Sequence, residues 1–337
     1  MARPYGLLRA GFPYLKSLGM RRLTNFPVDI ALGAEGRMYI LCRQESAALV
    51  RRYSFEDKDL GNFGEVGDAE GKLQWPVSIA ADRNENLYIS DEALDRVSAF
   101  TSEGTFLKCW GESGSKNGQL RRPAGLAFDA NGDLHVVDSL NHRVQKFTKD
   151  GKHILSWGSH GDGDGQFDMP WGITVDDAGD VYVADWRNDR VQKFNRDGEF
   201  ILKFGKSGSG DGEFNRPTDV AVDADGDIYV CDRGNDRVQL FNSEPRYVEK
   251  FIGDATLSQI ARDYMLTNAS PNRIRDMAVL EPQKRLRQPK GIAVDAQGRL
   301  YITDTGSYRV QVYQKEVIRL EPHQFAPPMR SVTLHQE

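Results

Sequence analysis

The sequence predicts an all-β protein, a six-bladed β-propeller of four-stranded antiparallel blades that is closed by a strand from the amino terminus. Three observations predict this fold. A short strand ends in Asp at a repeated interval of 47 residues, six prolines open similar units, and each unit contains runs of alternating apolar residues. A repeat of this length indicates supersecondary units that bury their apolar faces only by stacking on their neighbours.

The repeated Asp marks the end of the second strand of a unit. Asp91, Asp138, Asp185 and Asp232 follow one another at intervals of 47 residues, and Asp304 comes 72 residues after Asp232. An Arg opens the next strand each time. Because a catalytic residue rarely needs five copies, we interpret each Asp and Arg as a charge-assisted pair that holds the loop between them. The arginines are Arg96, Arg143, Arg190, Arg237 and Arg309.

Each unit contains signals for four strands. The opening proline begins an alternating strand such as TDVAVD, and a turn such as DADGD leads into a second strand rich in Val, Ile and Tyr. A third strand such as RVQKF follows, and a fourth ends in an apolar residue before Gly, as at Phe204 and Gly205. Such runs predict antiparallel meanders, and at this period they predict propeller blades. The opening prolines are Pro27, Pro76, Pro123, Pro170, Pro217 and Pro289.

The turns after the first strands also resemble a calcium-binding loop, because Asp223, Asp225 and Asp227 alternate. Ile228 stands where such a loop needs its Gly, and no Glu follows at the twelfth position. We therefore interpret these turns as tight hairpins that place Gly in the left-handed conformation.

The amino terminus supplies a strand that the last unit lacks. YLKSLG, ending at Gly19, has the form of a fourth strand, whereas the repeats end with a third-type strand over 308–313. We expect the amino-terminal strand to complete the sixth blade, which leaves no open edge in the ring. KEVIRL, residues 315–320, competes for that position. The chain then divides into an extension over 1–13, a propeller over 14–314 and a tail over 315–337.

An insertion of 24 residues separates the fifth and sixth units, within 254–287. ATLSQIARDYML places Leu257, Ile260 and Tyr264 on one helical stripe, and Ser270 provides the N-cap of a second helical segment. We expect this helical pair on the loop-rich face, the face that carries the loops between blades and those between second and third strands. It serves either as a docking element or as a clip on its own blades.

Composition is that of a globular protein, with 39% hydrophobic and 28% charged residues and a net charge of −5. No stretch approaches the roughly 18 apolar residues of a membrane span. Charged residues and a proline interrupt the amino terminus, so it lacks the unbroken apolar segment of a secretory signal, and we expect none. We expect a cytoplasmic protein whose three cysteines are reduced and mostly buried. These are Cys42, Cys109 and Cys231.

Units such as GSHGDGDGQFDMPWGITVDDAGDVYVADWRNDRVQKFNRDGEFILKFG resemble the NHL repeat. The resemblance covers residues 14 to about 313. It depends on the Gly and Phe before the proline, the Asp that ends the second strand and the NxRV that opens the third. The segment Asn141, His142, Arg143 and Val144 matches most fully. The first unit departs, because Cys42 replaces the Asp, and we expect that blade to lack the ion pair and to be looser.

The resemblance brings two enzyme classes into consideration. Relatives that are zinc-dependent lyases need several histidines on one ion, but His142 and His160 alone reach the loop-rich face. Calcium-dependent lactonases and esterases gather oxygen ligands at the channel mouth. At the second residue after the opening proline, Asp29 and Asp219 replace Gly. They are the candidate ligands for a divalent metal such as calcium, or else carboxylates that cap strand starts. No catalytic residue is identifiable.

Binding is the function that the sequence favours. Trp171, Trp186, Arg187, Arg216 and Arg233 fall in or beside loops of one face, and aromatic residues and Arg are enriched at interface centres. We predict a non-catalytic scaffold that binds a protein partner through the loop-rich face. A calcium-dependent lactonase or esterase is the first alternative. RNA binding on the same face is the second, and the negative net charge places it below a protein partner.

Overall fold

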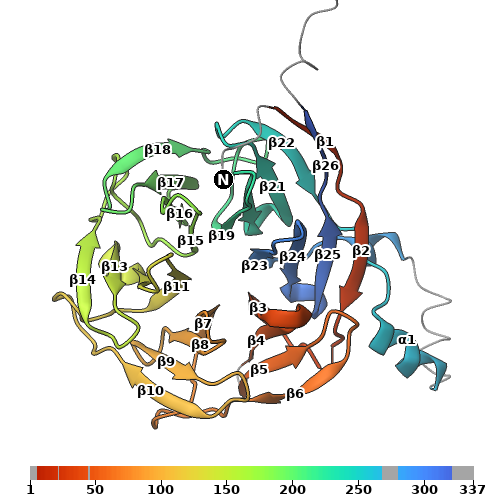
Figure 1. Ribbon diagram of the computed structural model, residues 1–337, viewed down its shortest axis with the longest axis horizontal. Helices are drawn as coiled ribbons and strands as arrows, with labels where there is room; N and C mark the ends of the chain where they lie inside the picture. Colours follow the sequence, from red (N-terminus) through yellow and green to blue (C-terminus); the bar gives the residue numbers. More distant parts are fainter. Residues whose placement is uncertain (1–5, 22, 45, 268–279, 321–337) are drawn as a thin grey trace, which may run out of the picture.

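The computed structural model describes residues 6–21, 23–44, 46–267 and 280–320. Six four-stranded antiparallel sheets surround a central channel like blades (Figure 1). The first strand of every blade lines the channel and the fourth lies at the rim. The predicted all-β six-bladed propeller is therefore confirmed.

Blades one to three each contain four consecutive strands. Blade one contains β3 (Pro27–Leu32), β4 (Met38–Gln44), β5 (Ala47–Tyr53) and β6 (Asp59–Phe63). Blade two contains β7 (Pro76–Ala81), β8 (Leu87–Asp91), β9 (Arg96–Phe100) and β10 (Phe106–Trp110). Blade three contains β11 (Pro123–Phe128), β12 (Leu134–Asp138), β13 (Arg143–Phe147) and β14 (His153–Trp157).

Blades four and five follow the same order, and blade six takes its first three strands from the end of the repeats. Blade four contains β15 (Ile173–Val175), β16 (Val181–Asp185), β17 (Arg190–Phe194) and β18 (Phe200–Phe204). Blade five contains β19 (Pro217–Val222), β20 (Ile228–Asp232), β21 (Arg237–Phe241) and β22 (Tyr247–Phe251). Blade six contains β23 (Pro289–Val294), β24 (Arg299–Asp304) and β25 (Arg309–Gln314).

The ring is closed by the amino-terminal strand, as predicted. Strand β2 (Tyr14–Leu18) pairs antiparallel with β25, and Leu18 lies opposite Val310. The competing segment forms β26 (Glu316–Leu320), which pairs with β1 (Gly6–Gly11) in a separate two-stranded ribbon. The two candidates for the same edge thus occupy different places, and Figure 1 shows the ribbon outside the blade that β2 completes.

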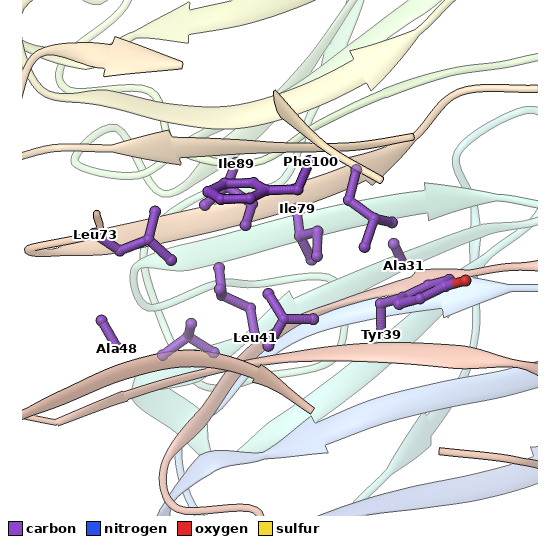
Figure 2. Close-up of a cluster of buried hydrophobic side chains, with 11 residues drawn as sticks. Ala31, Tyr39, Leu41, Ala48, Leu73, Ile79, Ile89 and Phe100 are labelled. Carbon is purple, nitrogen blue, oxygen red and sulfur yellow. The ribbon is translucent and has the colours of Figure 1, made fainter. Parts of the chain in front are cut away.

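The core lies between adjacent blades. Figure 2 shows the cluster between blades one and two, where Leu41 and Tyr39 of β4 face Ile79, Ile89 and Phe100 of blade two. These side chains are all at most 4% exposed. Such clusters recur between the other blades, so the alternating apolar residues of each strand are buried only when the neighbouring blade is present.

Four of the five predicted ion pairs are present. In blade three, Arg143 Nε donates to Asp138 Oδ2 at 2.7 Å, and its Nη2 donates to two carbonyls of the preceding interblade loop. Gln145 donates to the same Asp138 oxygen at 2.9 Å, a partner that the sequence analysis missed. The equivalent pairs are Asp185 with Arg190, Asp232 with Arg237 and Asp304 with Arg309.

Blade two is the exception that the sequence did not indicate. Asp91 accepts the backbone N–H groups of Gln74 and Trp75, and Arg96 donates to loop carbonyls instead of to Asp91. Ser98 stands where blades three to six carry Gln. Within the described residues, Ser98 Oγ and Arg96 Nε are buried without a hydrogen-bond partner. The fifth predicted pair is therefore absent, although both residues still hold the loop.

Blade one lacks the ion pair because Cys42 replaces the Asp, as expected, but its ladder is not looser. Strands β4 and β5 are paired at seven positions, against five in blades two to five. Their pairing continues to Gln44 and Ala47. Arg51 donates to the carbonyl of Leu23 at 2.8 Å. A longer hairpin thus replaces the frame that the ion pair provides elsewhere.

The ribbon of β1 and β26 is anchored on the DADGD turn of blade five. Lys315 Nζ lies 2.6 Å from Asp223, 2.9 Å from Asp225 and 2.8 Å from Asp227, and its side chain is only 3% exposed. Arg9 also pairs with Asp227. The three carboxylates that imitate a calcium loop therefore surround an ammonium group of the same chain.

The insertion forms α1 (Gln259–Leu266) and the short α3 (Glu281–Lys284), and the predicted second helix, residues 272–280, lies almost wholly outside the described residues. Ser258 is the N-cap of α1. Ile260 packs beside the core at the closing strand, and its N–H donates to Asp57 in the β5–β6 loop. The expected position on the loop-rich face is wrong for α1, which lies at the outer rim beside β2 (Figure 1). No helix of the described residues has the length and apolar character needed to span a bilayer.

Candidate functional site

The loop-rich face is set by strand pairing. Pro217, at the start of β19, pairs with Asp232, at the end of β20, and the same holds for Pro123 and Asp138 in blade three. The first strand therefore begins where the second strand ends. The loops between blades and the loops between second and third strands consequently share one face of the disc.

Two tryptophans and two arginines form a cluster on this face, which we call the tryptophan patch. The rings of Trp171 and Trp186 lie 6.1 Å apart between centroids at an angle of 40°. The guanidinium carbons of Arg216 and Arg187 lie 5.2 and 5.8 Å from the centroid of the Trp186 ring. Both tryptophans are half-buried and both arginines are exposed. The structure thus brings together four of the five binding residues that the sequence predicts.

The backbone holds Trp171 in place from two blades. Its N–H donates to Ala184 of β16 at 2.8 Å, and its carbonyl accepts the N–H of Gly125 at 2.8 Å. A Cβ atom on Gly125 would lie 2.6 Å from that carbonyl oxygen, so only glycine fits there. Trp186 follows Asp185, which is fixed by Arg190. The patch therefore stands on rigid strand ends.

Arg233, the fifth predicted residue, lies nearer the channel. It begins the 3₁₀ turn Arg233–Asn235 and donates to Gln288 Oε1 at 3.3 Å. Its Nε is buried and has no partner in the part of the chain that the structure describes. Burial and the charge of Arg216 lower the pKa of Arg233. Arg233 therefore belongs to a group of cations at the channel mouth.

Sequence reasoning missed two members of that group, Arg43 and Lys290. Arg43 directly follows Cys42, at the position that Arg233 occupies after Asp232. Lys290 directly follows Pro289, where the other blades carry uncharged residues. The signal in the sequence was that Lys290 is the one charged residue among the six that directly follow the opening prolines. The equivalents of Lys290 are Val28, Val77, Ala124, Trp171 and Thr218.

Asp29 lies at the narrow part of the channel and ties blade one to blade two. Its Oδ1 accepts the N–H of Ile30 and its Oδ2 accepts the N–H of Ile79, each at 2.8 Å. Burial raises the pKa of Asp29 to about 6. A Cβ on Gly291 of blade six would lie 2.7 Å from Oδ1. The carboxylate therefore occupies the space that a glycine of the neighbouring blade leaves free.

Asp219 repeats this arrangement between blades five and six. Its oxygens accept the N–H groups of Val220 and Ile292, each at 2.9 Å. Burial, and then the charge of Asp29, raise the pKa of Asp219. A calcium ion takes six to eight oxygen ligands, with ionised carboxylates among them. Two carboxyl groups that each accept two backbone N–H groups, and that burial pushes toward the protonated form, do not fit such an ion.

His142 and His160 meet on the loop-rich face, together with Asp168, which the sequence did not indicate as a metal ligand. Their potential ligand atoms lie within 4.8 Å of one another. However, His142 Nδ1 accepts the N–H of Met169 at 3.1 Å, so in the neutral ring Nε2 carries the proton and neither nitrogen is free for a metal. Burial and then His160 lower the pKa of His142, which favours that neutral ring.

The other blades explain why His142 accepts this bond. At the same position, Asp189 accepts the N–H of Arg216 at 2.6 Å, and Asp95 and Asp236 accept equivalent bonds. The residue that donates has a positive φ each time, as at Met169, where φ is 49°. His142 thus substitutes for an aspartate that secures the interblade loop.

Comparisons with known proteins agree with this architecture. The NHL repeat model matches residues 120–147, 167–194, 214–241 and 286–313, which contain strands of blades three to six. A search of curated protein sequences finds no significant match.

Solved structures share the fold at low identity. A streptogramin B lyase is 12% identical, with a TM-score of 0.58 over 90% of this chain and 98% of that one. A virginiamycin B lyase from Staphylococcus aureus is 13% identical, with a TM-score of 0.58 over 91% and 100%. A gluconolactonase from Xanthomonas campestris is 14% identical, with a TM-score of 0.61 over 92% and 100%. The matched repeats and the closed ring together show that this chain contains four NHL repeats and folds as a six-bladed β-propeller.

Proposed function

We propose that this propeller is a non-catalytic scaffold that binds a protein partner through its loop-rich face. The tryptophan patch is the observation that carries the proposal. It combines large aromatic surface with exposed arginines on a rigid frame, and such residues dominate the energy of protein interfaces. A scaffold of this kind needs no movement to bind, because the strand ends already hold Trp171 and Trp186.

The test is partner capture on immobilised protein, quantified by mass spectrometry for the wild type and for Trp171→Ala, Trp186→Ala and the double variant. We expect the double variant to capture about one tenth as much partner as the wild type, or less, because central aromatic residues contribute about 2 kcal/mol or more to an interface. Ile154→Ala with Ile201→Ala is the matched control, since both side chains are exposed on fourth strands at the rim. Equal capture by all variants with unchanged melting temperatures would contradict the proposal.

Two alternatives use the same region. The lyase and gluconolactonase likenesses support an enzyme through the fold alone, and the donor set at Asp29 and Asp219 does not fit a calcium-dependent hydrolase. RNA binding would use the cations of the channel mouth and would weaken steeply with salt. If nuclease treatment abolishes capture of the partner, the loop-rich face binds RNA and not a protein. A cytoplasmic location remains a prediction, which fractionation of the source cells tests.

A further inference from the structure

Cations from three blades gather at the channel mouth. Lys290 of blade six and Arg43 of blade one line the same cavity. Arg233 of blade five donates to Gln288, two residues before Lys290. Because the three residues come from strand ends of the ring, their positions are fixed by the blades and not by flexible loops.

The cavity beside them has the size of a small-molecule site. Its volume is about 430 Å³, within the usual range of about 300 to 1,000 Å³ for ligand pockets. Its walls combine cationic, polar and aromatic side chains, and the guanidinium carbon of Arg43 lies 4.4 Å from the centroid of the Trp75 ring. The lining residues are Phe26, Arg43, Gln44, Ser46, Trp75 and Lys290.

Among the described residues, Arg43 has an acidic partner, whereas Lys290 has none within ion-pair distance. Glu92 is the acidic group that acts on Lys290, but it is buried and already pairs with Arg122 at 2.8 Å and with Arg43 at 3.7 Å. Asp29 and Asp219 lie below, at the narrow part of the channel that Lys290 also lines, and their oxygens accept backbone N–H groups.

The charge of Lys290 is therefore poorly compensated. Burial, and then repulsion by Arg43 and Arg233, lower the pKa of Lys290 to about 7. The buried Nε of Arg233, which has no partner among the described residues, is a second sign of an unfilled cationic site. A group that supplies negative charge would stabilise both side chains.

We propose that the channel mouth binds an organic anion, with a carboxylate between Lys290 and Arg43 and an apolar body against Trp75 and Phe26. Charge-assisted hydrogen bonds from ammonium and guanidinium groups are the strong contacts for a carboxylate. The aromatic walls favour an anion with a flat or apolar group, because a simple inorganic ion cannot contact them in this way. The cavity is lined by other residues than the four of the tryptophan patch, and its proposed ligand does not depend on the proposed protein interaction.

The experiment is calorimetric titration of the purified protein with phenylacetate and with its neutral isostere phenylacetamide. We expect phenylacetate to bind and phenylacetamide to bind at least about tenfold more weakly, because only the carboxylate pairs with the cations. Lys290→Met should weaken phenylacetate by at least about tenfold and leave the amide unchanged. Lys149→Met is the control, since Lys149 is exposed on the β13–β14 loop, and it should bind like the wild type.

A proton measurement makes the test specific for Lys290. Since a bound carboxylate favours the charged ammonium, binding near pH 7.5 should take up a proton, which titrations in buffers of different ionisation heat detect. Lys290→Met should remove this uptake. Arg43→Gln is a second variant that tests the pocket if Lys290→Met does not fold.

The source of the anion is distinguished with a peptide probe, acetyl-Phe-Asp-amide, against acetyl-Phe-Asn-amide. Tighter binding of the Asp peptide than of phenylacetate indicates an acidic side chain of a protein, and the reverse order indicates a free metabolite. Absence of binding by both acids, or equal binding to the wild type and Lys290→Met, overturns the proposal. Either result leaves the tryptophan patch, which partner capture tests separately, unaffected.

Discussion

Single residues in this ring take their roles from the blade position that they occupy. The position after the second strand carries Arg43, Glu92, Trp186 and Arg233 in different blades. The backbone position is equivalent in each blade, but the side chains make different contacts on the loop-rich face. The position that secures the interblade loop carries Asp in three blades but His142 in blade three. Function can therefore change at one position while the fold is maintained by the others.

Asp29 gives a prediction about pH. Its pKa of about 6 in the folded protein exceeds the roughly 3.9 of an unfolded Asp. The folded state therefore holds the proton more strongly, and stability falls as pH rises from about 4 to about 6 and then levels off. Asp29→Asn removes this titration. The free energy of unfolding of the variant relative to the wild type should rise over that interval by up to about 3 kcal/mol.

Denaturant unfolding of both proteins at several pH values between 4 and 8 measures this difference. A constant offset is expected in addition, because an amide can accept only one of the two backbone N–H groups. Asp177→Asn, at an exposed turn of blade four, should give no slope. If the free energy of unfolding of Asp29→Asn relative to the wild type instead falls as pH rises, the two backbone hydrogen bonds stabilise the ionised carboxylate by more than burial destabilises it.

At the scale of elements, the ribbon of β1 and β26 depends on one buried ammonium. Lys315→Met leaves Asp223, Asp225 and Asp227 close together without their central cation. Breaking a buried ion pair from one side costs about 3 to 5 kcal/mol, so the free energy of unfolding should fall by about that amount. Because Arg9 and Arg319 still reach two of these carboxylates, the lower end is expected.

Calcium provides a further check on the same variant. Three alternating carboxylates are typical ligands for this ion, so millimolar calcium should recover part of the lost stability in Lys315→Met and none in the wild type. Thermal unfolding with calcium and with a chelator measures both effects. If Lys315→Met unfolds like the wild type without calcium, the ribbon is not held by this network.

At the scale of the whole molecule, the sequence predicts what repeats and fails where distant segments meet. Six prolines and five Asp residues mark the blades, and YLKSLG reveals the closure because it copies a fourth strand. Lys315 meets the turn at Asp223 across 92 positions, and no local pattern signals that contact. Arg43 and Lys290 likewise meet only because the ring closes. Contacts between residues this far apart in the sequence are set by the tertiary structure, and local sequence patterns do not predict them.

The closure itself gives the last prediction. Asp57, which is 3% exposed, accepts the N–H of Gly19 after β2 and the N–H of Ile260 in α1, each at 2.9 Å. One carboxylate thus joins blade one, the closing strand and the insertion, which acts here as a clip. Asp57→Ala leaves two N–H groups without their acceptor, and each such loss costs about 1 to 3 kcal/mol.

The loss should be local, because neighbouring blades support one another in sequence around the ring. Hydrogen exchange of Asp57→Ala should therefore accelerate in β2 and in its partner β25, while β12 and β16, on the far side of the ring, keep their protection. Asp177→Ala serves as the control, since its side chain is exposed in blade four. Equal acceleration in every blade would mean that the propeller opens as a single cooperative unit, and that the joint at β2 is no weaker than the other contacts between blades.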